Sequence, residues 1–492
     1  MKRPHAQSRP LTTILASSLA VAMATTITVS AAPAAQGQDL PPLGTNINDP
    51  EFGSSAPIPG LEHDTTTGEL SPQTNVVGDV WQGLRPIASQ QNAADDPAFY
   101  TAPEGTDLQN TEPGTVLRER TIDLHVATIP TALKVTQILY ATTNVRGEIE
   151  TNVTSVIKPP GRADGNVLSY QSIYDSSNPD DNPSRAIAGN MSLGGLIPAA
   201  ETGIIAPALL NGHTVVFADT EGADANFAAG PGYGYATLDS LRAARTAESS
   251  PVKENDNIGL LGYSGGSIAS NWAAIMLKEY APELEDSIVG VAQGGMLVNP
   301  VNNLEYAGEG ILWSGVVGLA LAALVKAYDI DIDEYLTDYG RKALADMSEL
   351  SIVEAFARYP GMTWDQLVKP EYPTPQDVPA VKEVIDDINM GNWSSPTIPM
   401  AIFQGAGGFL GGTPAHAEHG PGDGIMVTRD VRTLVRNYCE AGAQIEYREY
   451  PYASHVLTGA PWLIEGYLWL EGRFDGKPAT NNCSTVPSGN EL

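Results

Sequence analysis

Cysteine and basic residues are both scarce in this sequence of 492 residues. The two cysteines, Cys439 and Cys483, lack the spacing of a metal site. In an exported protein we expect them to form one disulfide that pins the C-terminal tail, with two free thiols as the alternative. Lys and Arg number 27 against 58 Asp and Glu, which gives a formal net charge of −31. Because no basic run or stripe appears, the composition argues against a nucleic-acid partner.

The N-terminus has the order of a secretory signal peptide. Lys2, Arg3 and Arg9 precede an apolar stretch over residues 11–29, and a cluster of small residues follows. An uncleaved membrane anchor is the alternative, but several Ser and Thr residues dilute the apolar stretch. We therefore expect a signal peptide over residues 1–35, secretion to the extracellular space or cell envelope, and a flexible leader over residues 36–95.

From about residue 97, short apolar runs alternate with helical segments. Two runs, 135–141 and 151–158, are predicted as antiparallel strands that precede the main sheet. Further strands are predicted over residues 166–173, 213–219, 257–262, 286–292, 399–404 and 445–450. Continuous apolar strands of this kind are typical of a parallel sheet that is covered on both faces. The pattern predicts the α/β class with a mostly parallel central sheet.

Between residues 299 and 396 this alternation stops. The run Ile311–Val325 is apolar all round and too short for a confident membrane span, and residues 331–351 and 378–388 are predicted to be helical. We interpret residues 299–396 as a helical cap, with ordinary outer helices as the alternative. The cap would be inserted between two parts of a core, residues 96–298 and 397–484, and a tail over residues 485–492 would follow.

A nucleophile-elbow pattern, G-x-S-x-G, is matched by Gly262, Tyr263, Ser264, Gly265 and Gly266. A serine on a sharp turn between strand and helix projects its hydroxyl above the sheet edge, and a Cβ at either flanking glycine would collide across that turn. The motif follows a predicted strand and precedes a predicted helix, whose N-terminal dipole favours negative charge at the site. The alternative is a glycine-rich turn that only connects the two elements.

A serine hydroxyl needs a histidine base, and in this fold the chain order is Ser, then an acid, then His. Three histidines follow Ser264, namely His416, His419 and His455. His455 is favoured because it follows a predicted strand in a short loop. The H-x-x-H spacing of His416 and His419 has no helical frame and no third ligand to support a metal. We expect neither a metal nor a cofactor.

The favoured acid is Asp423, in a Gly-rich loop after the strand over residues 399–404. Its rival Asp430 falls inside the following predicted helix, and Glu446 and Glu449 lie within the strand before the histidine. Asp423 is therefore predicted to orient the histidine.

The oxyanion of ester cleavage requires two backbone N–H donors. Gly265, the residue after the nucleophile, is one expected donor. The other should come from the loop after the strand over residues 166–173, at Tyr174, Asp175 and Ser176. The alternative is that this loop is an ordinary turn.

Stretches spanning about residues 96–483 resemble the secretory lipase family of the α/β-hydrolase superfamily, the relatives of Candida antarctica lipase A, and especially its actinobacterial branch. The matching stretches are DPAFYTAPEG, PGTVLRERTI, YDSSNP, LGYSGGSIASNWAA, GDGIMV, NYCEAGAQIEYREYPYASH and GRFDGKPATNNC. The sequence TPAHAEHG before Asp423 departs from the fungal pattern, which bears on local geometry and substrate reach.

The resemblance implies an α/β-hydrolase fold with a helical cap that houses an acyl-chain tunnel. It also implies a triad of Ser264, Asp423 and His455, an oxyanion hole from the backbone amides of Asp175 and Gly265, and a disulfide between Cys439 and Cys483.

Together, the motifs and the resemblance predict a secreted lipase or carboxylesterase that hydrolyses acyl esters, triacylglycerols foremost, through an acyl-enzyme. The expected partners are a lipid or small ester substrate and, transiently, a lipid interface. Two alternatives stay open: an acyltransferase that uses the same acyl-enzyme, and a catalytically silent surface or binding protein.

Overall fold

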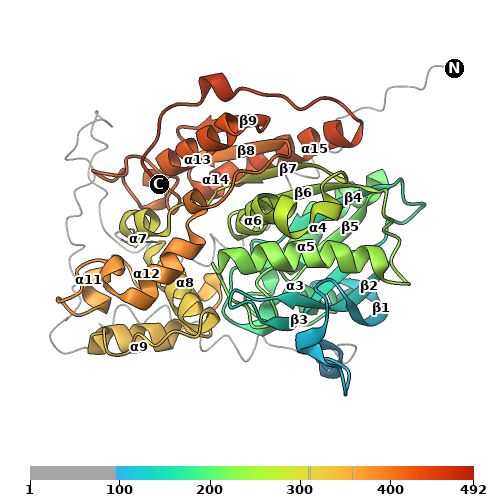
Figure 1. Cartoon of the computed structure of the whole chain (residues 1–492), viewed down its shortest axis with the longest axis horizontal. Coiled ribbons are helices and arrows are strands. Elements are labelled where there is room, and N and C mark those ends of the chain that lie inside the picture. Colours follow the sequence, from blue (N-terminus) through green and yellow to red (C-terminus); the bar gives the residue numbers. More distant parts are fainter. Residues whose placement is uncertain (1–95, 309, 311, 357) are drawn as a thin grey trace.

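A mixed β-sheet forms the centre of the part of the chain that the computed structural model describes, residues 96–492 without 309, 311 and 357 (Figure 1). The predicted signal peptide and leader lie outside the described residues. The strand order is β1-β2-β3-β5-β4-β6-β7-β8-β9. The strands are β1 (Val116–Val126), β2 (Ile129–Thr143), β3 (Ile149–Ile157), β4 (Asn166–Gln171), β5 (Thr214–Ala218), β6 (Asn257–Tyr263), β7 (Ile288–Gly294), β8 (Met400–Gly405) and β9 (Ile445–Tyr450).

The pairing changes direction along the sheet. β1, β2, β3 and β5 pair antiparallel in that order, whereas every pairing from β5 through β4 to β9 is parallel. This confirms the predicted α/β class with a mostly parallel sheet. Parallel strands end at the same edge, so the loops after β4, β6, β8 and β9 gather on one side.

Helices cover both faces of the sheet. In β6, Leu260 packs in an apolar cluster with residues of α5, α6 and α13, whereas its neighbour Leu261 packs in a different cluster with residues of α4 and α15. Neighbouring residues of a strand point to opposite faces, so both must be apolar when both faces are covered. These helices are α4 (Leu196–Asn211), α5 (Gly230–Thr246), α6 (Gly265–Tyr280), α13 (Thr428–Glu440) and α15 (Tyr467–Phe474).

A group of helices between β7 and β8 lies at one end of the molecule, beside the sheet (Figure 1). Their buried side chains form an apolar cluster that contains Leu319, Met347 and Tyr359. They are α7 (Pro300–Gly308), α8 (Ser314–Ala327), α9 (Asp338–Met347), α10 (Ile352–Ala355), α11 (Trp364–Leu367) and α12 (Pro379–Ile388). No helix among the described residues is both long and apolar enough to cross a bilayer. The cap boundaries at residues 299 and 396 stay a prediction.

The predicted helix over residues 331–351 was wrong at both ends, because α9 covers only Asp338–Met347 and Ser351 is extended. Helix α9 begins at Asp338, because Thr337 adopts an extended conformation and its Oγ1 accepts a hydrogen bond from the N–H of Gly340 (2.9 Å). Just before Thr337, Leu336 forms an antiparallel bridge with Val368 and is not part of a helical turn.

The C-terminal tail is attached to α13. Cys439 near the end of that helix forms a disulfide with Cys483. Further on, the side chain of Asn490 donates hydrogen bonds to Asp430 Oδ1 (2.7 Å) and to the carbonyl of His419 (3.1 Å). The tail therefore contacts the loop that contains Asp423.

His213, immediately before β5, is buried between two carboxylates. Its Nδ1 lies 2.9 Å from Asp164 Oδ2 and its Nε2 lies 2.8 Å from Glu471 Oε1. Burial acts to lower the pKa of His213, but the hydrogen bonds and charges of the two acids outweigh it and raise that pKa above its ordinary value. Burial likewise opposes ionisation of Glu471, yet the hydrogen bond from His213 lowers the pKa of this acid.

We expect this contact to stabilise the fold most between about pH 4.5 and pH 6.5. The contribution of His213 is full below its unfolded pKa and is lost as pH rises through its raised folded pKa. The contribution of Glu471 is present above its unfolded pKa and is lost as pH falls through its lowered folded pKa. His213→Gln should lower the thermal unfolding midpoint by about 2 °C at pH 5.5, and by less at pH 8.5. An equal loss at both pH values in calorimetry would contradict this account.

Candidate active site

Ser264 lies in a strained turn between β6 and α6. Its backbone has φ 55° and ψ −121°, a conformation that residues with a Cβ rarely adopt. A Cβ at Gly262 would lie 2.1 Å from the carbonyl oxygen of Gly266, and a Cβ at Gly266 would lie 2.3 Å from that of Gln171. The flanking glycines are therefore required for strand, turn and helix to approach this closely.

Gly262→Ala should destabilise the fold by about 1–3 kcal/mol, because backbone atoms rather than a flexible side chain occupy the space of the new methyl group. Gly161→Ala is the matched control, since no atom lies within 4 Å of its Cβ position. Urea unfolding of both variants measures the difference. Equal midpoints would show that the turn relaxes without cost.

The structure brings Ser264, His455 and Asp423 into one hydrogen-bonded chain. Ser264 Oγ lies 2.8 Å from His455 Nε2, and His455 Nδ1 lies 2.8 Å from Asp423 Oδ2. The exposed fractions are 8% for Ser264, 4% for His455 and 0% for Asp423. With Nδ1 donating to the carboxylate, Nε2 is free to accept the proton of the serine hydroxyl.

The Asp423 carboxylate is oriented by its own surroundings. Its Oδ1 accepts hydrogen bonds from the N–H groups of Ile425 (3.1 Å) and Met426 (2.8 Å), and its Oδ2 also accepts one from Gln404 Nε2 (3.0 Å). The N–H of His455 donates to the carbonyl of Asp423 (2.6 Å). Acid and base are thus linked through backbone as well as side chain.

The sequence placed His455 in a short loop, but the structure places it in a helix. It is the first residue of helix α14 (His455–Pro461), because the Ser454 side chain caps that helix by accepting a hydrogen bond from the N–H of Leu457. Two aromatic rings pack against the imidazole, with centroid distances of 5.1 Å for Tyr263 and 5.3 Å for Trp313. Trp313 lies at the start of α8, and no sequence motif indicated it.

Asp175 and Gly265, the two expected oxyanion donors, lie side by side. A Cβ at Gly265 would lie 1.6 Å from Asp175 Oδ1, so a larger residue at this position would require the Asp175 carboxyl group to move. Burial, together with the nearby charge of Glu201, raises the pKa of Asp175 well above its usual range. Burial also raises the pKa of Glu201 to about 7.

Two buried glutamates hold the loop around Asp175. Glu201 Oε1 accepts a hydrogen bond from the N–H of Ile173, and Glu221 Oε2 accepts one from the N–H of Ser176, each at 3.0 Å. Sequence reasoning missed both glutamates, because nothing in their local sequence sets them apart from surface acids.

The three alternative acids from the sequence, Asp430, Glu446 and Glu449, have partners other than His455. Glu449 pairs with Arg432 (2.6 Å), and Glu446 pairs with Arg448. Asp430 accepts hydrogen bonds from Asn302 and from the C-terminal tail.

The two histidines of the H-x-x-H motif contact each other and nearby acids. His416 and His419 stack on each other with ring centroids 4.5 Å apart. Glu305 and Glu418 lie beside His419, and the possible ligand atoms of these three residues lie within 4.8 Å of one another. The H-x-x-H spacing did not predict this cluster of His419 with two glutamates, and His416 does not belong to the cluster.

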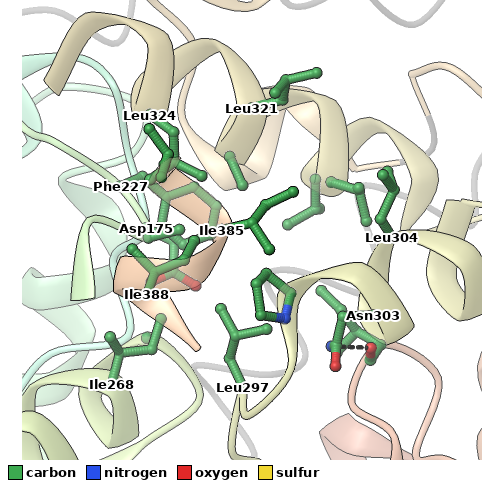
Figure 2. A pocket seen from close by; sticks show the side chains of 18 of the residues that line it. Asp175, Phe227, Ile268, Leu297, Asn303, Leu304, Leu321, Leu324, Ile385 and Ile388 are labelled. Atoms are coloured by element: carbon green, nitrogen blue, oxygen red, sulfur yellow. Dashed lines mark hydrogen bonds between the residues drawn. The ribbon is translucent and has the colours of Figure 1, made fainter. Parts of the chain in front are cut away.

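An apolar cavity, lined by Ser264 among others, extends between the core and helices α7, α8 and α12. Figure 2 shows this cavity from close by. Its space, with the open solvent at its mouth included, is about 980 Å³. Asp175 and Ser264 line the core end. The remaining wall is almost wholly aliphatic or aromatic and includes Ile268, Leu297, Leu304, Leu321, Leu324, Ile385 and Ile388. A cavity of this composition suits a hydrocarbon chain.

The sheet topology and the strained serine turn together define a protein of the α/β-hydrolase class. A family model sharpens this assignment, because the "Secretory lipase" model matches residues 190–482. The chain belongs to the secretory lipase family.

Relatives with known sequences and structures are similar over most of the chain. The "Probable inactive lipase MT1628" of Mycobacterium tuberculosis is 34% identical over 402 residues, which cover 79% of this chain and 84% of that protein. "Lipase 1" of Candida albicans is 30% identical over 416 residues, covering 81% and 84%. The crystal structure of Candida antarctica lipase A in its closed state matches with a TM-score of 0.69 and 25% identity, covering 82% of this chain and 91% of that one.

Proposed function

We propose that the protein is a secreted serine hydrolase that cleaves carboxylic esters, triacylglycerols foremost, through an acyl-enzyme. The observation that carries the proposal is the unbroken hydrogen-bonded chain from Ser264 through His455 to Asp423 at the end of an apolar cavity. Membership of the secretory lipase family supports an ester of lipid origin as substrate, and the family together with the disulfide supports an extracellular site of action.

In the proposed mechanism, Ser264 Oγ attacks the ester carbonyl carbon while His455 Nε2 takes its proton. Asp423 orients the imidazole and stabilises its charged form. The backbone N–H groups of Asp175 and Gly265 stabilise the oxyanion, aided by the positive end of the α6 dipole. The proton on His455 then leaves with the alcohol, and a water molecule activated by the same histidine releases the fatty acid.

We assign residues 299–396 as the cap and its cavity as the acyl site. Each methylene group moved from water into an apolar wall contributes about 0.8 kcal/mol, so a chain of several carbons would bind here without polar contacts. The polar groups at the core end would then hold the ester at the reacting position.

A catalytically silent protein is the second candidate, because a relative with 34% identity carries the name "Probable inactive lipase". The intact hydrogen-bonded chain in this protein favours activity. A fluorophosphonate probe separates the two, since it labels only an activated serine.

Ser264→Ala should reduce kcat for p-nitrophenyl butyrate by about 10⁵–10⁶-fold and abolish fluorophosphonate labelling, because the nucleophile is gone. Ser394→Ala, which changes an exposed serine, is the matched control and should behave like the wild type. Thermal unfolding should show both variants folded. Labelling that persists in the Ser264 variant would refute the assigned nucleophile.

Exposed apolar side chains flank the catalytic histidine and support contact with a lipid interface. Phe409, Leu410, Tyr452 and Leu457 are 50% to 73% exposed. The two segments that contain them adjoin, since the N–H of Gly407 donates to the carbonyl of Ala453 (3.0 Å). Apolar groups exposed together in this way mark interaction surfaces.

Replacing Phe409 and Leu410 with Ser should lower the rate on an emulsified triacylglycerol several-fold and leave the rate on soluble p-nitrophenyl acetate unchanged. Leu210→Ser is the control. Leu210 is 65% exposed in the last turn of α4, which leads into the amino end of β5, whereas Phe409 and Leu410 follow the carboxyl end of β8. Equal losses on emulsion and soluble ester would exclude an interfacial role.

A further inference from the structure

Two segments far apart in the sequence pair with each other beside Ser264. The oxyanion loop, residues 173–177, follows β4 in the core, and the cap strap, residues 350–352, leads into α10 and includes its first residue. Ser176 and Ser351 form an antiparallel β-bridge between them. Both serines are fully buried, so water does not compete for these backbone groups.

The peptide group between Asp175 and Ser176 is held from both sides by this arrangement. On its oxygen side, the N–H of Ile352 donates a hydrogen bond to the carbonyl of Asp175 (2.8 Å). On its nitrogen side, the N–H of Ser176 donates to Glu221 Oε2 (3.0 Å). One of the two contacts therefore comes from the core and the other from the cap.

Holding this peptide group restricts the orientation of the Asp175 N–H, because only the φ and ψ angles of Asp175 separate the two. Its φ is +35°, in the left-handed region where non-glycine residues are strained. Such a conformation persists only when its surroundings impose it. The contact with Ile352 is one of those that impose it.

The cap strap is itself rigidly anchored. The N–H of Ser177 donates to the carbonyl of Leu350 (2.8 Å). The N–H and hydroxyl of Ser351 both donate to Glu354 Oε2 (3.0 Å each), which forms a capping box at the start of α10. A Cβ at Gly194 would lie 2.6 Å from Ser351 Cβ, so the core packs closely against the strap.

We infer that the backbone N–H of Ile352 is a positioning group for ester hydrolysis: it holds the Asp175 carbonyl and so aims the Asp175 N–H at the oxyanion. The inference rests on the proposed function. Its consequence is that the cap does more than enclose the acyl chain. Since the Ile352 side chain also lines the acyl cavity, one residue contacts both the substrate chain and the oxyanion loop.

The variants Ile352→Pro and Ile352→Ala test this directly. Both variants lose the branched aliphatic side chain of Ile352, but only proline also removes the N–H and places a ring carbon against the Asp175 carbonyl. Ile352 is the first residue of α10, where proline is tolerated, and Ser351 before it is extended (φ −93°, ψ 165°), as a residue before proline must be. Asp338→Pro, at the equivalent position of α9, is the control for introducing proline into the cap.

The substrate is p-nitrophenyl acetate, because its acyl group is too short to depend on the cavity wall. Ile352→Pro should lower kcat by about 10²–10³-fold with KM nearly unchanged, which is the loss expected for one oxyanion donor. Ile352→Ala keeps the N–H, so its kcat should stay well above that of Ile352→Pro, and Asp338→Pro should stay within about threefold of the wild type. Equal kcat values for the Pro and Ala variants of Ile352 would overturn the inference. A wild-type protein that neither hydrolyses the ester nor reacts with fluorophosphonate would instead overturn the proposed function.

If thermal unfolding shows that Ile352→Pro does not fold, the pair Glu354→Ala and Glu354→Gln decides the question. Alanine breaks the capping box that anchors the strap, and glutamine preserves it. Glu354→Ala should lower kcat at constant KM, and Glu354→Gln should restore it. Identical kcat values in these two variants would overturn the inference.

Discussion

The left-handed backbone of Ser264 is the constraint on which the rest of the site depends. It exists because β6, α6 and β4 approach one another so closely that no Cβ fits at Gly262, where it would meet Gly266, or at Gly266, where it would meet Gln171 of β4. The same closeness places Gly265 against Asp175 in the loop after β4. Strain at one residue is thus maintained by the packing of a buried strand and helix, whose apolar contacts compensate for it.

Carboxyl groups surround this turn, and their environments differ. Asp423 accepts three hydrogen bonds and a fourth contact from the imidazole of His455. The acids behind the oxyanion loop are instead buried with few compensating cations, and burial raises the pKa of Glu201 to about 7 and that of Asp181 to about 6. Neutral carboxyl groups can accept hydrogen bonds from backbone N–H groups without the full cost of a buried charge.

Much of this architecture could be predicted from short stretches of sequence. The strands were predictable because a doubly covered sheet requires continuous apolar runs, and Ser264, Asp423 and His455 because each follows such a run in the order typical of the fold. The start of α14 at His455 could not be predicted. A serine such as Ser454 is common both in turns and at helix N-caps, and local propensity does not decide between the two. Trp313, Glu201 and Glu221 escaped notice since their importance depends on contacts with residues far away in the sequence.

The apolar cavity and the hydrogen-bonded chain come from different parts of the molecule. Most of the cavity wall belongs to α7, α8 and α12, whereas Ser264, Asp423 and His455 follow the carboxyl ends of β6, β8 and β9. Under the proposed function, substitutions in these three helices would change which acyl chains bind and would leave the hydrogen-bonded chain intact. Ile352 lines the cavity and also donates a hydrogen bond to the Asp175 carbonyl, so a substitution there would change the reaction rate together with the choice of acyl chain.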